Sequence, residues 1–360
     1  MKFIEPNTPI IPFHNHPKAL LKFVAERGIQ VATITDHCSI DVQELDTDFD
    51  ALISYWDYCE LIARCQESLN EPALGLHFGQ RLTFNGHGMV GLGALACNTV
   101  QEALELALAF KKMVSPVTHV QLNYEAPLAS ISCSPTFDNN KLYPFFVETL
   151  FATLISSLKQ FTHQTHARYR FEFAYPEPHY ASEYEHFFDG EIIFDAPHTR
   201  ILAPREILAT RLPTANPLIV HTTKRFVAAS QSSHLQNGYG IIESIKQAIK
   251  KATTPAPSLP EIARQLHTSS STLKRKLKEA QSSYTTILSQ TQLERACQML
   301  ETNQKRVDDI SVSLGYSEAS AFRRAFKCWS GLTPSEYRQR FAYLQNSLAA
   351  GEQILQQESA

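Results

Sequence analysis

The 360 residues are enough for two domains, and a hydrophobic fraction of 43% is ample for buried cores. The net charge of −3 is small, but it conceals basic residues gathered toward the C-terminal end. Seven cysteines without a C-x-x-C pair, no apolar run of roughly 18 residues and no signal-peptide core argue against a disulfide framework, a membrane span and export, so we expect a cytoplasmic protein.

The first third of the chain predicts helices separated by glycine-rich turns. Helices are expected over residues 17–27, ended by Gly28, and over residues 50–69. His14 and His16 do not predict a metal site, since residues two apart share no helix face. The glycines between Leu74 and Gly93 lack the G-x-x-x-x-G-K-[ST] spacing of a phosphate loop. They therefore predict close packing of neighbouring segments.

The next stretch adds strands, so the first domain is predicted to be α+β. Thr99 to Glu102 is a capping box that opens a helix over residues 101–113. Strands are predicted over residues 117–124 and 128–133, and an apolar helix over residues 144–161. Residues 168–175 alternate, with aromatic side chains on one face and Arg170 and Glu172 on the other, which predicts a half-buried strand.

Short strands over residues 191–195 and 200–202 and a helix over residues 213–229 complete this domain, which spans residues 1–229. Residues 230–238 are polar and aperiodic, and they predict an interdomain linker over residues 230–242. A loop is expected over residues 253–257 within the second domain.

The C-terminal part contains the same helical pattern twice. Ser258 to Glu261 is a capping box that begins a short helix ending near Leu266, and a second helix follows from about Ser270 to Ala280. A second copy runs from Val307 to Leu314, turns at Gly315 and continues from Glu318 to Trp329, with Ser317 as the expected N-cap.

Two short helices joined by a tight turn, with a basic face on the second helix, are typical of a helix-turn-helix unit. An amphipathic helix over residues 284–301 separates the two copies. We therefore predict an all-α domain over residues 243–341, with units at about 259–280 and 307–329, and a helical or frayed tail over residues 342–360. The alternative, a plain helical bundle with solvated arginines, does not explain the duplication.

The charge distribution agrees with this division. Residues 245–340 contain 16 Lys and Arg against 8 Asp and Glu, whereas residues 1–244 contain 17 against 26. A basic domain on an acidic body is the electrostatic footprint of a protein that binds phosphates at one end.

At this point the sequence resembles the AraC/XylS-type transcriptional regulators. The C-terminal resemblance rests on Ile310, Leu314-Gly315-Tyr316-Ser317, Ser320-Ala321-Phe322-Arg323-Arg324-Ala325-Phe326-Lys327, Trp329, Gly331 and Thr333-Pro334-Ser335-Glu336-Tyr337-Arg338. The first copy departs from the family pattern at two positions. The family usually has glycine where this chain has Gln281, and often arginine where it has Gln292. The first domain resembles the arabinose-binding-like regulatory domain through Ala25-Glu26-Arg27-Gly28-Ile29, Leu74–Gly79, Gly88, Gly91, Ala94, Thr99, Glu102-Ala103-Leu104 and the segment after Pro144.

The resemblance implies a sequence-specific DNA-binding regulator with double-stranded promoter DNA as its partner. Two recognition helices on one spacer could enter successive major grooves, roughly 34 Å apart. The predicted DNA-binding residues are Ser270, Ser271, Lys274, Arg275, Lys278, Ser317, Glu318, Ser320, Ala321, Arg323, Arg324 and Lys327. Of these, Lys278, Arg323 and Lys327 are expected to contact phosphates and the others to approach base edges.

The resemblance also implies that the first domain senses a small molecule or forms a homodimer. Phenylalanines concentrated in residues 142–195 suggest a hydrophobic pocket for a fatty-acid-like effector, although plain core packing also explains them and an amino-acid-like effector fits equally. The predicted effector-binding residues are Phe146, Phe151, His166, Arg168, Arg170 and Phe171.

The alternatives are a ligand-independent regulator whose first domain only dimerises, and an enzyme with an appended DNA-binding domain. No catalytic motif such as G-x-S-x-G or H-E-x-x-H occurs, so we predict no enzyme activity, no catalytic residue, no metal and no cofactor. RNA polymerase is a further expected partner, and a membrane is not. Any DNA target would lie in the bacterial nucleoid.

Overall fold

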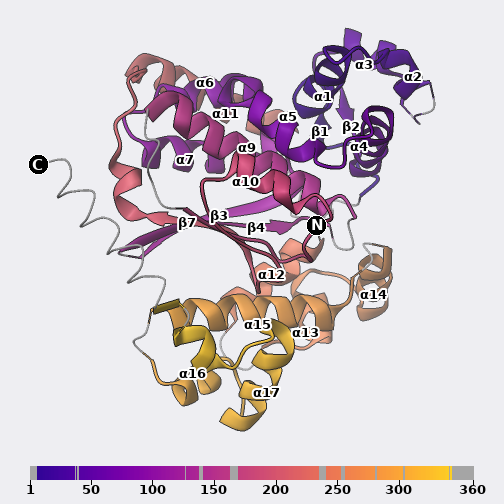
Figure 1. The fold of residues 1–360 in the computed structure, drawn as a ribbon. Helices are drawn as coiled ribbons and strands as arrows, with labels where there is room; N and C mark the ends of the chain where they lie inside the picture. Colours follow the sequence, from indigo (N-terminus) through magenta and orange to yellow (C-terminus); the bar gives the residue numbers. More distant parts are fainter. Residues whose placement is uncertain are drawn as a thin grey trace, which may run out of the picture.

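The computed structural model describes residues 6–36, 38, 40–125, 127–137, 141–162, 169–234, 241–252, 256–279, 282–302, 305–339 and 341–342. Figure 1 shows a central sheet with a layer of helices above it and an all-helical domain below it. A small lobe, whose helices and strands lie between Ile11 and Leu69, lies beside the helical layer. None of the helices in the described part of the chain combines the length and apolar content needed to cross a membrane.

The lobe is built on a two-stranded antiparallel ribbon, and its core continues into the helical layer through Leu74, Phe78 and Phe145. In it, Phe13, Leu61 and Ile62 are fully buried. Ser54 caps the longest helix, because its hydroxyl accepts from the Asp57 N–H at 3.2 Å. The elements are β1 (Ile11–Pro12), α1 (His16–Ala25), α2 (Val31–Thr35), α3 (Val42–Thr47), β2 (Leu52–Ile53) and α4 (Tyr55–Leu69).

The helical layer covers one face of the sheet, and glycines allow its helices to approach closely. A Cβ atom on Gly75 would lie 2.5 Å from Glu148 Oε2, and one on Gly79 would lie 2.5 Å from the carbonyl oxygen of Thr149. The prediction of close packing at these glycines is confirmed. The elements are α5 (Leu74–Leu82), η1 (Phe84–His87), α6 (Gly88–Leu95), α7 (Val100–Ala109), α8 (Lys111–Val114), α9 (Tyr143–Thr162), η2 (Ala181–Glu183), α10 (Tyr184–Phe187), η3 (Arg205–Ala209) and α11 (Pro217–His234).

The sheet has five strands in the order β3-β4-β7-β5-β6, and only β5 and β6 pair in parallel. Its two faces differ in chemistry because side chains alternate along each strand. On β4, Ala129 and Ile131 pack into the main core, whereas Ser130 and Ser132 face the helical domain. The strands are β3 (Thr118–Glu125), β4 (Leu128–Pro135), β5 (Tyr169–Glu172), β6 (Gly190–Ile193) and β7 (Thr199–Pro204).

The C-terminal domain contains two helix-turn-helix units with separate cores. Ile245, Ile262 and Leu273 belong to the core of the first unit, and Ile310 and Phe326 belong to that of the second. The elements are α12 (Ile241–Lys251), α13 (Leu259–Gln265), α14 (Ser270–Glu279), α15 (Tyr284–Glu301), α16 (Val307–Ser313) and α17 (Ala319–Ser330). The α+β and all-α division predicted from the sequence is therefore confirmed.

Several predicted boundaries require correction. The linker predicted for residues 230–242 is shorter, because α11 continues to His234 and α12 begins at Ile241. The helix predicted over residues 101–113 breaks at Phe110 into α7 and α8. The strand around Arg170 is buried on both faces rather than on one, because the C-terminal domain covers the face that was expected to meet solvent.

Candidate nucleic-acid interface

The first unit presents a basic helix to solvent. Leu273 and Leu277 of α14 are buried in the core, which directs the intervening side chains outward. Ser258 begins α13 as predicted, since its backbone N–H donates to Glu261 Oε2 at 2.6 Å. The exposed predicted contacts here are Ser271, Lys274, Arg275 and Lys278, and Ser270 is half-buried.

The second unit is arranged in the same way. Phe322 and Phe326 of α17 are fully buried. Gly315 turns the chain before α17 with a φ of +86°, a backbone conformation that favours glycine. The exposed predicted contacts here are Ser317, Glu318, Ser320, Arg323, Arg324 and Lys327, and Ala321 is half-buried.

The predicted N-cap of this helix is one residue too early. Glu318, not Ser317, is the N-cap of α17. The turn before α17 is therefore one residue longer than predicted. Within it, the Tyr316 N–H donates to the Ser311 carbonyl at 3.0 Å. The first α-helical hydrogen bond therefore runs from the Phe322 N–H to the Glu318 carbonyl at 3.3 Å.

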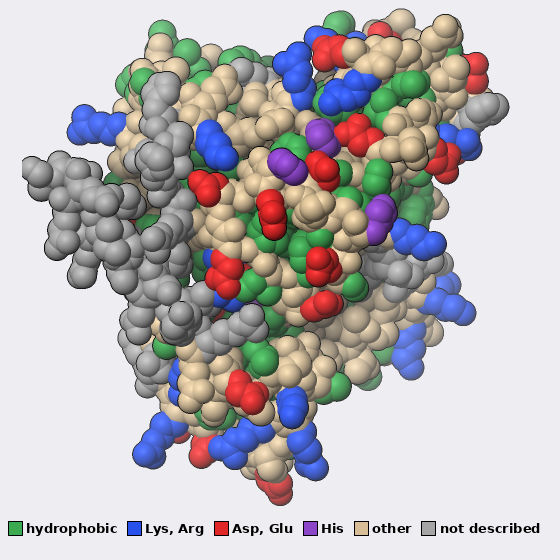
Figure 2. Space-filling model, viewed as in Figure 1, with side chains coloured by type: hydrophobic (Ala, Val, Ile, Leu, Met, Phe, Trp, Pro, Cys, Tyr) green, Lys and Arg blue, Asp and Glu red, His purple; other side chains and the backbone are tan. Residues whose placement is uncertain are grey.

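Positive charge gathers on these two helices. Figure 2 shows blue Lys and Arg side chains at the lower end and the lower right of the molecule, where α17 and α14 lie in Figure 1. Arg323 is paired with Asp308 of α16, with 2.7 Å between its Nη2 and Oδ1. Lys274, Arg324 and Lys327 form no ion pair with the described residues, so their charges are available to phosphates or bases.

Helix α15 fixes the second unit relative to the first. In Figure 1, α14 lies beyond the right end of α15, and α16 and α17 lie beneath it. Gln292 on α15 accepts from the Tyr316 hydroxyl at 3.2 Å and donates to the Leu314 carbonyl at 3.4 Å. The glutamine that departs from the family pattern thus holds the turn of the second unit.

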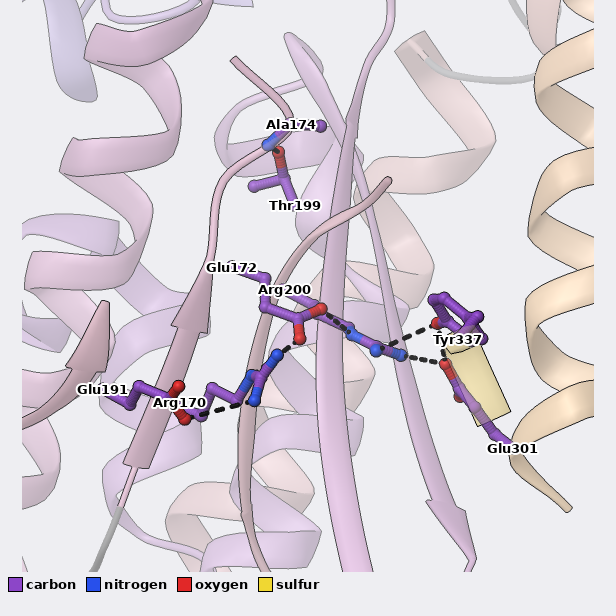
Figure 3. A network of polar contacts seen from close by, with 8 residues as sticks. All are labelled: Arg170, Glu172, Ala174, Glu191, Thr199, Arg200, Glu301 and Tyr337. Carbon is purple, nitrogen blue, oxygen red and sulfur yellow. Dashed lines mark hydrogen bonds and ion pairs between the residues drawn. The ribbon is translucent and has the colours of Figure 1, made fainter. Parts of the chain in front are cut away.

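The same helix docks on the polar face of the sheet through a buried network (Figure 3). Arg200 on β7 is central to it. Its Nε donates to Glu172 Oε2 at 2.6 Å, and its Nη1 donates to Glu301 Oε1, also at 2.6 Å. Its Nη2 reaches the Tyr337 hydroxyl at 3.2 Å. One guanidinium therefore joins the sheet to the end of α15 and to the segment after α17.

The network extends away from the junction along the sheet. Arg170 Nε donates to Glu172 Oε1 at 2.8 Å, and its Nη1 donates to Glu191 Oε2 at 3.1 Å. Burial alone would raise the pKa of Glu172, but Arg200 and Arg170 together lower it below the ordinary value. Glu172 is therefore an anion at neutral pH, shared between two buried arginines.

Two cavities stand out among the described residues. A cleft of about 810 Å³ lies between the sheet and α15, and polar and charged groups, including His198, Glu294 and Lys246, line it. A cavity of about 80 Å³ lies inside the first domain between the sheet and its helical layer, with a mainly apolar lining. Either one could admit a small molecule, since ligand sites are concave and few per protein.

The predicted effector residues that the structure describes do not line a common cavity. Phe146 lines the smaller cavity. Phe151 and Phe171 are fully buried in the main core, and Arg170 belongs to the junction network. His166 and Arg168 lie outside the described residues.

The junction does not follow from local sequence patterns. Arg200 and Glu301 lie 101 positions apart, so no local pattern connects them. The available signal was charge inside strands: Arg170, Glu172 and Arg200 all occupy segments predicted to be strands. Three charged residues on one sheet face predict a polar partner for that face, and the C-terminal domain is that partner.

Comparison with known families follows the same division of the chain. A family model described as the arabinose-binding domain of AraC transcription regulators, N-terminal, matches residues 28–212, just over half of the chain. A helix-turn-helix domain model matches residues 262–340. The two matches correspond to the α+β domain and to the two-unit helical domain.

Individual proteins align over most of the length. The ornithine utilization regulator of Pseudomonas aeruginosa is 29% identical over 324 residues, which cover 90% of this chain and 95% of that protein. The transcriptional regulator VqsM of the same species is 25% identical and covers 74% of this chain and 84% of its own. The crystal structure of CdpR, also from P. aeruginosa, covers 89% of this chain and 97% of its own, with 19% identity and a TM-score of 0.42.

Proposed function

The chain belongs to the AraC family of DNA-binding transcription regulators, and we propose that its first domain binds a small-molecule effector that controls how the second domain binds promoter DNA. The observation that carries this proposal is the Arg200 junction. It ties the sheet of the regulatory domain to Glu301 and Tyr337 of the DNA-binding domain. A change in the sheet is thereby transmitted to the helix that positions the second reading unit.

The reading chemistry resides on α14 and α17. The N-terminal parts of both helices approach base edges, with Lys274 and Arg324 suited to the guanine O6 and N7 acceptors. Lys278 and Lys327 lie further along their helices and contact phosphates. Arg323 forms an ion pair with Asp308. It therefore contacts the DNA phosphate backbone only after that ion pair breaks.

The coupling requires two arrangements of the junction that the effector distinguishes. In the arrangement described here, Arg200 holds both Glu301 and Tyr337. An effector that shifts β4 or β7 would change this contact and, with it, the position of the second unit relative to the first.

Two classes of effector fit the regulatory domain. The name of the ornithine utilization regulator of Pseudomonas aeruginosa favours an amino-acid-like compound. The polar cleft at the junction offers both signs of charge to such a compound. The apolar lining of the smaller cavity favours a hydrophobic, fatty-acid-like carboxylate. The two classes differ in their site, and they can therefore be separated by mutation.

The alternative is a ligand-independent regulator whose first domain only dimerises. The observation in its favour is that Leu218, Ile219 and Phe226 of α11 are exposed by 72%, 41% and 53%. On this alternative, Phe226→Asp would convert a dimer to a monomer in sedimentation experiments, and no metabolite would change operator affinity.

The test is fluorescence anisotropy of the purified full-length protein against its own upstream intergenic DNA and a scrambled duplex, across a salt series. Specific recognition predicts binding to the native fragment about 10³-fold tighter, with a steep negative salt slope. Candidate effectors are then added to the same assay. A metabolite that changes affinity for the native fragment supports effector control.

Equal affinity for both duplexes at every salt concentration, with and without candidate effectors, would contradict sequence-specific regulation. A matched control is Arg225→Ala, because Arg225 is an exposed arginine on α11, and Figure 1 shows α11 in the upper helical layer, on the far side of the sheet from α14 and α17. This variant should bind as the wild type does, whereas Lys274→Ala should bind more weakly.

A further inference from the structure

The smaller cavity combines an apolar wall with a basic end. Leu104, Ile131 and Leu150 contribute to the wall, and the volume is about 80 Å³. Three basic residues line the same cavity: His16 at the start of α1, His87 at the end of η1 and Lys111 at the start of α8. They come from three separate elements, so their convergence is a property of the fold.

The basic groups at this end are only partly satisfied. Lys111 Nζ donates to the carbonyl oxygens of Ser115 at 2.7 Å and Thr118 at 2.6 Å, which uses two of its three N–H groups. His16 Nε2 and His87 Nδ1 are buried without a hydrogen-bond partner among the described residues. The two imidazole rings lie with their centroids 4.8 Å apart.

No carboxylate among the described residues balances the charge at this end of the cavity. Burial lowers the pKa of His16, and His87 and Lys111 lower it further. Burial likewise lowers the pKa of His87 to about 4 and that of Lys111 to about 8. None of these three pKa values is raised by a described carboxylate, although Cys133 raises that of Lys111 and a hydrogen bond to the Thr83 backbone raises that of His87. Buried polar groups are usually paired, because leaving them unpaired is costly.

We propose that this cavity binds a small aliphatic monocarboxylate, with the carboxylate between His16, His87 and Lys111 and the hydrocarbon along the apolar wall. The proposal rests on the proposed effector-binding function and names its site and ligand class. An anion would accept a hydrogen bond from the third N–H group of Lys111 and from each imidazole in the tautomer that places its proton toward the cavity, and it would offset the ammonium charge. Cationic amino acids are rejected at the same end by like charge.

The cavity volume sets the size of the ligand. One water needs about 10–15 Å³ measured in the same way, so 80 Å³ corresponds to about five to eight non-hydrogen atoms. An acid of about four to six carbons meets this limit. A long-chain fatty acid does not, and a second carboxylate would lie unpaired against the apolar wall.

The position of the cavity connects it to the junction. Val120 on β3 and Ile131 on β4 line it from one face of the sheet. Their strand neighbours Gln121, Ser130 and Ser132 line the cleft on the opposite face, toward α15. A ligand that presses on these two strands therefore acts on the surface where the DNA-binding domain docks.

Binding of such a ligand should depend on pH through Lys111. The titratable groups that act on this end of the cavity are His16 on α1, His87 on η1 and Cys133 on β4. The pKa of Lys111 is about 8 in the free protein, and a bound anion raises it. The apparent Kd for the acid should then rise about tenfold per pH unit above about pH 8, until the pKa of the complex is passed.

The experiment measures the thermal stability and calorimetric binding of the full-length protein with straight-chain acids from acetate to octanoate. The comparison ligands are 1-pentanol, which lacks the carboxylate, succinate, which has two, and ornithine. We expect a rise in Tm that is largest for butanoate to hexanoate and absent for the three comparison ligands. The rise should disappear in Lys111→Met and persist in Lys159→Met, where an exposed lysine of α9 is replaced.

A second variant covers the case in which Lys111→Met does not fold. Ala107→Leu places three additional carbons at the cavity wall and should abolish binding while leaving the basic groups in place. The proposal is overturned if no short acid binds, if pentanol binds as well as pentanoate, if only octanoate, succinate or ornithine binds, or if both variants retain binding. Because none of these measurements uses DNA, they fail independently of the operator assay.

Discussion

At the scale of single residues, two adjacent arginines of α17 are in different states. Arg323 is held by Asp308, whereas Arg324 is exposed and forms no ion pair with the described residues. We expect Arg324→Ala to weaken operator binding by about 1–3 kcal/mol and to relax specificity at one base pair, because a bidentate contact to guanine is lost. Anisotropy against a set of single-base operator variants measures both effects. Uniform weakening across all variants would instead assign Arg324 to the phosphate backbone.

A buried acid gives the regulatory domain a pH dependence of its own. Burial raises the pKa of Glu148 to about 7, although the hydroxyls of Tyr184 and Tyr180 donate to it at 2.6 and 2.8 Å and partly oppose that rise. The ordinary value is 4.5, so between these pH values the folded state keeps a proton that the unfolded state releases. The stabilisation contributed by Glu148 is therefore complete below pH 4.5 and is lost as pH rises through about 7. The free energy of unfolding falls by about 3 kcal/mol in all.

Glu148→Gln should remove that loss, because the amide remains neutral at every pH. Urea unfolding at pH 5, 6, 7 and 8, followed by the fluorescence of Trp56 in a Trp329→Phe background, measures the slope. The exposed carboxyl of Glu105 provides the control, since Glu105→Gln should keep the wild-type slope. Equal slopes in Glu148→Gln and the wild type would show that Glu148 titrates at its ordinary pKa.

At the scale of elements, the two reading units have separate cores and should fail separately. Phe326 is fully buried in the core of the second unit, and Phe326→Ala should cost about 3–5 kcal/mol there. The first unit, built around Leu273, should remain folded. In Phe326→Ala, we expect footprinting to show protection of only the half of the operator that the first unit binds. In Leu273→Ala, we expect protection of only the other half. Loss of both halves in either variant would mean that the units fold as one.

The elements also show how far local sequence patterns reach. Helices α13 to α17 follow from capping boxes, glycines and apolar spacing, all of which act within one turn or two. The Glu261 carboxylate, for example, accepts from the Ser258 N–H at 2.6 Å, as the capping box at the start of α13 predicts. The site of the small cavity could not be predicted, because His16, His87 and Lys111 are brought together by packing of distant helices. The ion pairs of Arg170 depend on packing in the same way: Glu172 lies on its own strand, but Glu191 lies 21 positions away on β6.

At the scale of the whole molecule, Arg200 connects the domains and Arg170 does not. Arg200→Met leaves Glu172 and Glu301 without a shared cation, and such a break costs about 3–5 kcal/mol. We expect the domains of this variant to unfold separately, so that Trp56 and Trp329, one in each domain, report different midpoints. In Arg170→Met, whose partners Glu172 and Glu191 lie in the first domain, the two midpoints should remain coincident. Coincident midpoints in both variants would show that the Arg200 junction does not couple the unfolding of the two domains.

The docking of α15 on the sheet has a consequence for how such a regulator changes its targets over evolutionary time. If the two units bind two half-sites as proposed, the helix that ends at Glu301 would set the separation and rotational phase of those half-sites, and Arg200 of the regulatory domain holds that end. Promoters in which the spacing of the half-sites changes would therefore select compensating substitutions on β5 and β7. The base pairs recognised at each half-site would still depend on α14 and α17. Operator geometry and operator sequence are thus inherited through different domains.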